Sequence, residues 1–366
     1  MTKLVFKVHS RTRYQASKFP LHLRPEEDEL LSSWLIRLAL LHHTMPCTFT
    51  NLYLPETRNK LWSADIDLQA TPSVLCALSD KSGLPVCKLH LLTLKSYEGY
   101  LFEEAFPKTK ETPFVNRAGM RGRRCRLPAW RFCPMCLKED ATPYVRRKWR
   151  LSFSTACLKH RCFLLDRCPR CESPVTPYRR PQVGDFPNCD LCGSPLTEAE
   201  VEVIPQASYG LTAIKKIYEI LDNGFLILKG IPVYSFLFFR IVHHLCKAAY
   251  FWDKKMGLID HEIMQHQLRD LPWEQKVREL EDVRLKEQYL IFSGVMRLFD
   301  PYPDNFLGYC VQNGLGRTDL SKDLGIIPFW YSEMTDLFDL KYWRLSKEGS
   351  QKRDMLCDGR WHETRT

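Results

Sequence analysis

Four short cysteine turns in the middle of the chain limit what this region can fold into, because each holds two metal-ligand side chains with two residues between them. The first pair of turns supplies Cys133, Cys136, Cys157 and His160. The second pair supplies Cys168, Cys171, Cys189 and Cys192. A tetrahedral zinc ion needs four soft or borderline ligands, and such a spacing aims both side chains of one turn at one point. The spacing therefore predicts two structural zinc ions, one with three cysteines and a histidine and one with four cysteines.

Other uses of these cysteines agree less well with the sequence. Disulfides suit secreted chains, but residues 1–7 lack the apolar run of a secretory signal and the cysteine count is odd, at 15. We therefore expect a cytoplasmic protein with reduced thiols. Catalytic zinc leaves one position open for water, whereas both quartets are complete. Cys162 follows His160 by two residues and is a possible competing ligand of the first ion.

The positive charge of the chain is concentrated around these turns. Residues 117–180 contain 17 Lys and Arg side chains against four acidic ones, a net charge of +13. The rest of the chain carries 36 basic and 39 acidic side chains, although the whole chain carries +10. Thiolate centres attract some nearby cations, but two such centres do not account for +13. We expect this region to contact nucleic acid or a nucleoprotein complex.

Two segments supply the candidate nucleic-acid contacts. The first is an arginine-rich arm before the first turn, and in the second, basic residues alternate with aromatic ones. Arginine suits phosphate oxygens, and aromatic side chains next to it can stack on bases or pack internally. The candidate residues are Arg117, Arg121, Arg123, Arg124, Arg126, Arg146, Arg147, Lys148 and Arg150.

Helical patterns flank the cysteine-rich region on both sides. Pro25 and the acidic residues 26–29 predict a helix start before an apolar stripe that runs to Leu41. Further on, Thr71-Pro72 and Gly83 bound a short helix, and a second helix follows to Leu94, which is a helix-turn-helix pattern. That pattern also suits a compact helical domain used for protein contacts.

From Leu211 the pattern is helical to the end, and the apolar segment 231–240 is interpreted as the start of a buried helix. Residues 320–330 contain a weak signal for a second helix-turn-helix. No run of apolar residues is long enough to span a membrane. We therefore predict a mainly α fold with small zinc-ribbon β elements. Its parts are an N-terminal helix-turn-helix-like domain (1–115), a basic arm with a tandem zinc-binding domain (116–205) and a C-terminal helical domain (206–366).

No catalytic motif accompanies these features. The sequence has no Gly-x4-Gly-Lys-Ser/Thr phosphate loop and no Gly-x-Ser-x-Gly elbow. Its acidic residues form no isolated group typical of a two-metal nuclease. A structural or adaptor protein is favoured over an enzyme, with a zinc-containing nuclease or transposase as a weaker possibility.

Several segments together resemble the TniQ family, which includes TnsD-type proteins and serves transposon targeting. The central ones are residues 132–140 (FCPMCLKED), 143–151 (PYVRRKWRL), 157–160 (CLKH) and 164–171 (LLDRCPRC). Residues 29–38 (ELLSSWLIRL) are similar to the opening helix of the family, and residues 300–306 and 327–330 to its C-terminal part. The stretch 172–188 departs from the family pattern, which leaves the pairing in the second quartet less certain than in the first.

The resemblance implies a non-enzymatic adaptor in DNA transposition. Family members link a target-bound complex to the AAA+ ATPase TnsC, and some dock on an RNA-guided CRISPR complex such as Cascade, often as a homodimer. Others read an attachment site in DNA directly, as TnsD does. The near-neutral charge outside residues 117–180 favours the adaptor over the direct reader. The resemblance places the zinc ligands on the same eight residues as the spacing does.

Overall fold

The computed structural model describes nine segments of the chain, namely residues 18–57, 61–62, 65–104, 112–118, 120–121, 125–176, 187–251, 279–322 and 324–338. Within them the fold is mainly helical, with small two-stranded sheets, as predicted. The α-helices are α1 (Leu31–Leu41), α2 (Pro46–Tyr53), α3 (Ile66–Gln69), α4 (Pro72–Ser82), α5 (Val86–Leu91), α6 (Pro134–Glu139), α7 (Tyr209–Asn223), α8 (Ser235–Phe251), α11 (Leu285–Arg297), α12 (Asp304–Gln312), α13 (Arg317–Ser321) and α14 (Phe329–Thr335).

The strands form three separate antiparallel pairs, and short 3-10 turns connect several elements. The strands are β1 (Met120–Arg121) with β2 (Cys125–Arg126), β3 (Ala156–Cys157) with β4 (Cys162–Phe163), and β5 (Phe225–Leu228) with β6 (Ile231–Tyr234). The 3-10 turns are η1 (Pro55–Thr57), η2 (Leu94–Tyr97), η3 (Arg147–Arg150), η5 (Leu196–Glu198), η6 (Leu280–Asp282) and η7 (Asp336–Phe338).

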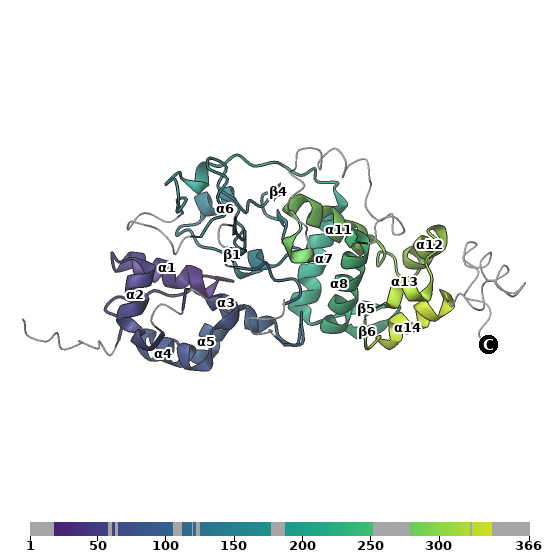
Figure 1. Cartoon of the computed structure of the whole chain (residues 1–366), viewed down its shortest axis with the longest axis horizontal. Coiled ribbons are helices and arrows are strands. Elements are labelled where there is room, and N and C mark those ends of the chain that lie inside the picture. Colours follow the sequence, from purple (N-terminus) through teal and green to yellow (C-terminus); the bar gives the residue numbers. More distant parts are fainter. Residues whose placement is uncertain are drawn as a thin grey trace, which may run out of the picture.

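The elements are arranged along the long axis of the molecule in chain order (Figure 1). Helices α1 to α5 lie at one end, the cysteine-rich region with α6 and β4 lies above the middle, and α7, α8 and α11 pack side by side beyond it. Helices α12 to α14 lie at the opposite end. One hydrophobic core cluster includes residues of all these parts, from Phe19 to Phe338. The domain limits at 115 and 205 stay a prediction.

The predicted helix start at Pro25 is wrong, because α1 begins only at Leu31. The acidic residues before it have buried partners instead of lying on a first helical turn. Glu29 is fully buried and accepts hydrogen bonds from Arg37 (2.6 Å) and from the Ser33 hydroxyl (2.9 Å). Asp28 has a φ of 54°, outside the helical region, and lies against Arg147. The ion pairs of the tertiary structure therefore outweigh the local preference for a helix start.

Helices α4 and α5 lie on either side of the turn predicted at Gly83. The hydroxyl of Thr71 caps α4 by accepting from the backbone N–H of Val74 (3.4 Å), and Gly83 ends this helix with a φ of 76°. A left-handed φ favours glycine at such a helix end. The second helix is shorter than predicted and ends at Leu91, after which the chain continues into η2.

The C-terminal part contains a β-hairpin that the sequence analysis did not predict. Residues 231–234, interpreted above as the start of a helix, form β6, and α8 begins at Ser235. The hairpin closes through Lys229 and Gly230, which both have a positive φ. Apolar strands and apolar helix starts are alike in short windows, so the turn decides between them. In the described part of the chain, no helix is both long enough and apolar enough to cross a bilayer.

Candidate metal centres

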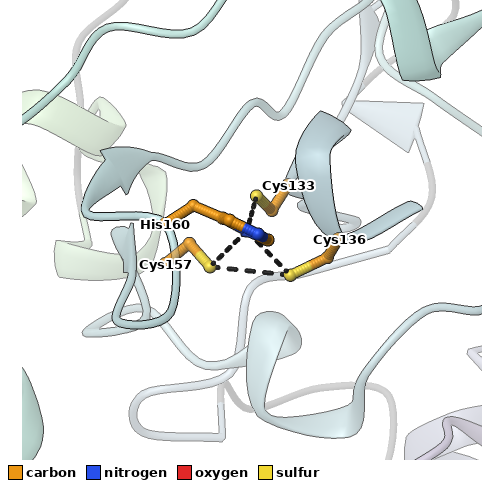
Figure 2. A group of neighbouring side chains, drawn as sticks. All are labelled: Cys133, Cys136, Cys157 and His160. Atoms are coloured by element: carbon orange, nitrogen blue, oxygen red, sulfur yellow. Dashed lines mark hydrogen bonds between the residues drawn. The ribbon is translucent and has the colours of Figure 1, made fainter. Parts of the chain in front are cut away.

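The first four ligand-type residues converge on one point, as Figure 2 shows. The Nδ1 atom of His160 lies 3.3 Å from the Sγ atoms of Cys133 and Cys136 and 3.6 Å from that of Cys157. The sulfurs of Cys136 and Cys157 are 3.6 Å apart. All four ligand atoms lie within 4.8 Å of one another, and the three cysteines are buried.

Two local structures present these side chains. Cys133 precedes α6 and Cys136 lies in its first turn, so both face the same side of the helix. Cys157 ends β3, and His160 lies in the turn that leads into β4. The second nitrogen of His160, Nε2, is 3.0 Å from a carboxylate oxygen of Glu139. A carboxylate behind a histidine fixes the ring orientation and leaves the other nitrogen free to act as a metal ligand.

The second quartet is built from two knuckles, and none of its four ligands lies in a helix. The Sγ atoms of Cys168 and Cys192 are 3.6 Å apart, and those of Cys171 and Cys189 are 3.7 Å apart. The hydroxyl of Ser194 lies 3.0 Å from the sulfur of Cys192 and 3.3 Å from that of Cys168. Hydrogen bonds from Ser194 hold the pKa of the Cys192 thiol at about 6. This lowering favours the thiolate form that binds metal.

A left-handed residue follows the last ligand of three of the four turns. These residues are Arg161 (φ 50°), Glu172 (φ 55°) and Gly193 (φ 73°). In the second quartet, the next N–H groups donate back across each knuckle, from Glu172 to the carbonyl of Cys168 (2.8 Å) and from Gly193 to that of Cys189 (3.1 Å). The backbone thus reverses directly after the ligands, which aims both side chains of a turn inward.

The geometry and chemistry of both quartets fit a tetrahedral metal ion. With metal–sulfur bonds of about 2.3 Å, two sulfurs on one tetrahedral ion are about 3.8 Å apart. The sulfur pairs at 3.6 and 3.7 Å agree with this separation. Thiolate and imidazole ligands without an open position suit a structural zinc ion. The structure therefore contains two clusters that can hold two metal ions.

We expect Glu139→Ala to weaken metal binding at the first centre by roughly ten- to a hundredfold, since the carboxylate orients His160. Competition with a chelating dye measures this affinity, and binding at the second centre should not change. Lys159→Ala is the matched control, because Lys159 pairs with the same carboxylate (2.7 Å) but is not a ligand. Equal affinities for the Glu139→Ala variant and the wild type would contradict the role of Glu139.

The basic residues 146–150, predicted above to contact nucleic acid, are used inside the molecule. Arg146 makes a two-pronged ion pair with Asp140 (2.7 and 3.0 Å), and its guanidinium lies over the rings of Tyr144 and Trp149. Lys148 pairs with Asp222 (2.8 Å). These contacts join the basic segment to the rest of the fold.

The other two side chains of this segment are held still more firmly. Arg147 pairs with Asp28 (3.2 Å) and lies over the ring of Tyr97. Arg150 is fully buried between Asp65 and Asp67. Arg150 therefore has no exposed side-chain surface in this structure and serves as the cation between these two carboxylates, while its contact with a nucleic acid stays a prediction. The sequence alone does not predict these ion pairs, because the acidic partners lie far away along the chain.

The arm is described only in part. Arg117 is half-buried and pairs with Asp282 (2.5 Å). Arg121 and Arg126 lie in β1 and β2, where only the backbone is described, and Arg123 and Arg124 lie outside the described residues. Several basic side chains around the two centres are exposed. They are Lys138, Lys159, Arg161, Arg167 and Arg170.

Sequence reasoning did not find the side chains that support the ligands. In the sequence, Glu139 is only one of the four acidic residues of segment 117–180, and Ser194 belongs to none of the predicted motifs. A carboxylate one helical turn after Cys136 is a usable signal for a histidine partner. Ser194 follows the last cysteine by two residues, a position that polar residues often occupy for other reasons, so sequence offers little there.

The TniQ family model matches residues 20–164. This part of the chain is similar to the TniQ family. It includes helices α1 to α6 and the whole first centre, and it ends before the second. TniQ proteins are associated with transposition as targeting proteins. No curated protein matches the chain.

Proposed function

We propose that this protein is a non-enzymatic target-selection adaptor of a DNA transposon. It connects a target-bound recognition complex of the RNA-guided Cascade type to the AAA+ ATPase TnsC. The observation that carries this proposal is the TniQ match over residues 20–164, which includes the first metal centre. The proposal places the protein in the cytoplasm, where thiol ligands stay reduced, with a homodimer as a possible assembly.

Two zinc ions have a structural role in this proposal. The ligand sets are Cys133, Cys136, Cys157 and His160 for the first ion, and Cys168, Cys171, Cys189 and Cys192 for the second. The cysteines of the two quartets form no disulfide in this structure, so their thiols can bind metal. Each quartet is complete, which agrees with a structural rather than a catalytic ion.

The nucleic-acid contact is proposed for the arginine-rich arm rather than for residues 146–150. Arg146, Arg147, Lys148 and Arg150 pair with carboxylates of this same chain. Ion pairs within the protein lower the charge available to phosphates. The side chains of Arg121, Arg123 and Arg124 stay candidates for contact with nucleic acid or with a partner bound to it.

Replacing Arg121, Arg123 and Arg124 together with alanine should weaken binding to target DNA or to the target-bound complex. Each lost phosphate contact lowers the salt slope by about one, so the triple variant should lower it by up to about three. Binding titrations at several salt concentrations measure this slope. A control with Lys88→Ala, Lys215→Ala and Lys229→Ala removes the same charge from exposed positions outside the basic region. Equal slopes for the two triple variants would rule out the proposed contact.

A direct reader of an attachment site, as in TnsD, is the alternative function. Its reading element would be α5, the second helix of the helix-turn-helix pattern. The exposed side chains of α5 are Val86, Cys87, Lys88 and Leu91, of which only one is basic. The adaptor is therefore favoured. Gel-shift assays with the purified protein alone separate the two, because tight sequence-specific binding supports the direct reader.

A further inference from the structure

A fourth sulfur lies next to the three sulfurs of the first metal centre. The Sγ atom of Cys162 is 3.7 Å from that of Cys133, and the Cys162 side chain is fully buried. This separation equals that of sulfur pairs within the two quartets, which are 3.6 and 3.7 Å apart. Cys162 is not one of the four residues whose ligand atoms all lie within 4.8 Å of one another.

The backbone holds Cys162 in this position. β3 and β4 pair so that Cys162 lies directly opposite the ligand Cys157, and directly opposite residues in a ladder project from the same face. The other edge of β4 is also held, because the N–H of Phe163 donates to the carbonyl of Glu202 (3.0 Å) and Cys162 bridges to Val203. Both cysteines of this strand pair therefore face the metal site.

His160 is the ligand that is easiest to replace. It is the single neutral ligand of the quartet and lies in the turn between Cys157 and Cys162. The side chain of His160 is itself only 7% exposed, but its outer nitrogen contacts Glu139, whose side chain is 46% exposed, whereas the three cysteines are buried. A movement of this turn would release the imidazole at the surface without disturbing the buried sulfurs.

We propose that Cys162 is a reserve ligand of the first centre, which then uses Cys133, Cys136, Cys157 and Cys162. The imidazole of His160 leaves the ion and the sulfur of Cys162 takes its place. One metal–nitrogen bond breaks, one metal–sulfur bond forms, and the thiol proton of Cys162 passes to the released imidazole. No electron is transferred. With zinc, the charge of the centre changes from −1 to −2, because a thiolate replaces a neutral ligand.

The test uses metal content and therefore does not depend on transposition. His160→Ala should still contain two zinc ions per chain, and His160→Ala/Cys162→Ala should contain one. Cys162→Ala alone should contain two, because the histidine set is intact. A matched control is His160→Ala/Cys246→Ala, which removes another fully buried cysteine, in α8 and away from both clusters, and should contain two.

Cobalt substitution adds a second measurement. The intensity of the sulfur-to-cobalt charge-transfer band follows the number of bound thiolates. The wild type has seven thiolate ligands and His160→Ala should have eight, so the band should be more intense in the variant. The proposal would be overturned if His160→Ala lost the first ion or unfolded. It would also be overturned if His160→Ala/Cys162→Ala still contained two zinc ions. The inference rests on the zinc sites proposed above. Wild-type protein with fewer than two zinc ions would instead contradict those sites.

Discussion

Replacing Arg150 with methionine is expected to destabilise the protein by about 3–5 kcal/mol, the usual cost of removing one partner of a buried ion pair. The guanidinium of Arg150 has no exposed surface and contacts carboxylate oxygens of Asp65 (2.5 Å) and Asp67 (2.9 Å). It also donates to the carbonyl of Asn116 (2.9 Å). Methionine fills similar space but leaves the fully buried carboxylate of Asp67 without its cation.

The pH dependence of this loss provides a further check. Burial raises the pKa of Asp67 from 3.8 to about 7, and Arg150 opposes this shift. Because the pKa in the folded state lies above that of the unfolded chain, the contribution of Asp67 to stability declines as the pH rises from about 4 to about 7. Without Arg150 the pKa rises further, so the variant should lose less stability near pH 5 than near pH 8.

Chemical denaturation of both proteins at the two pH values measures these differences. Arg167→Met is the control, because its side chain is 48% exposed and lies 3.8 Å from Asp166. Such an exposed pair contributes at most about 1 kcal/mol. If Arg150→Met were no more destabilising than Arg167→Met, Arg150 would not have the structural role assigned to it, and its contact with a nucleic acid would again deserve testing.

Removal of the metal ions is expected to unfold the middle of the protein. Structural zinc sites bind with apparent free energies of about 10–16 kcal/mol near neutral pH, and this free energy stabilises the fold. Among the residues that the structure describes, both centres lack long strands or helices of their own, apart from the short α6, and their cysteines belong to or pack against the common hydrophobic core. Without the ions, the turns lose their strongest link and keep weaker ones, such as the hydrogen bonds from Thr176 to the carboxylate of Asp190 (2.9 and 3.0 Å).

Elemental analysis should find two zinc ions per chain, and a strong chelator should lower the melting temperature and the circular dichroism signal. Cys171→Ala removes a ligand of the second centre and should reduce the content to one ion. Cys76→Ala is the matched control, because this cysteine is exposed on α4 and belongs to neither quartet. A chelated protein with an unchanged melting curve would contradict the structural role of the ions.

The sequence itself determined the ligand-type quartets, since two-residue gaps restrict where the side chains of a tight turn can point. It also determined many helices, such as α4, where Thr71 and Gly83 mark both ends through local hydrogen bonds and backbone conformation. The TniQ resemblance likewise depends on local motifs within residues 20–164. All of these features follow from chemistry between residues that are close along the chain.

Only the tertiary structure shows which acidic residues pair with the basic residues 146–150. Charge alone indicated a surface for phosphates at residues 146–150, but Asp28, Asp65 and Asp222 approach this segment from distant parts of the chain. Ion pairing also explains why α1 begins later than predicted, because Glu29 pairs with Arg37 instead of lying in the first turn of the helix. The tertiary structure also places Cys162 beside Cys133, although the two residues are twenty-nine positions apart in the sequence. A buried charge requires a partner wherever the fold can supply one, and distance along the chain does not reveal which residue that is.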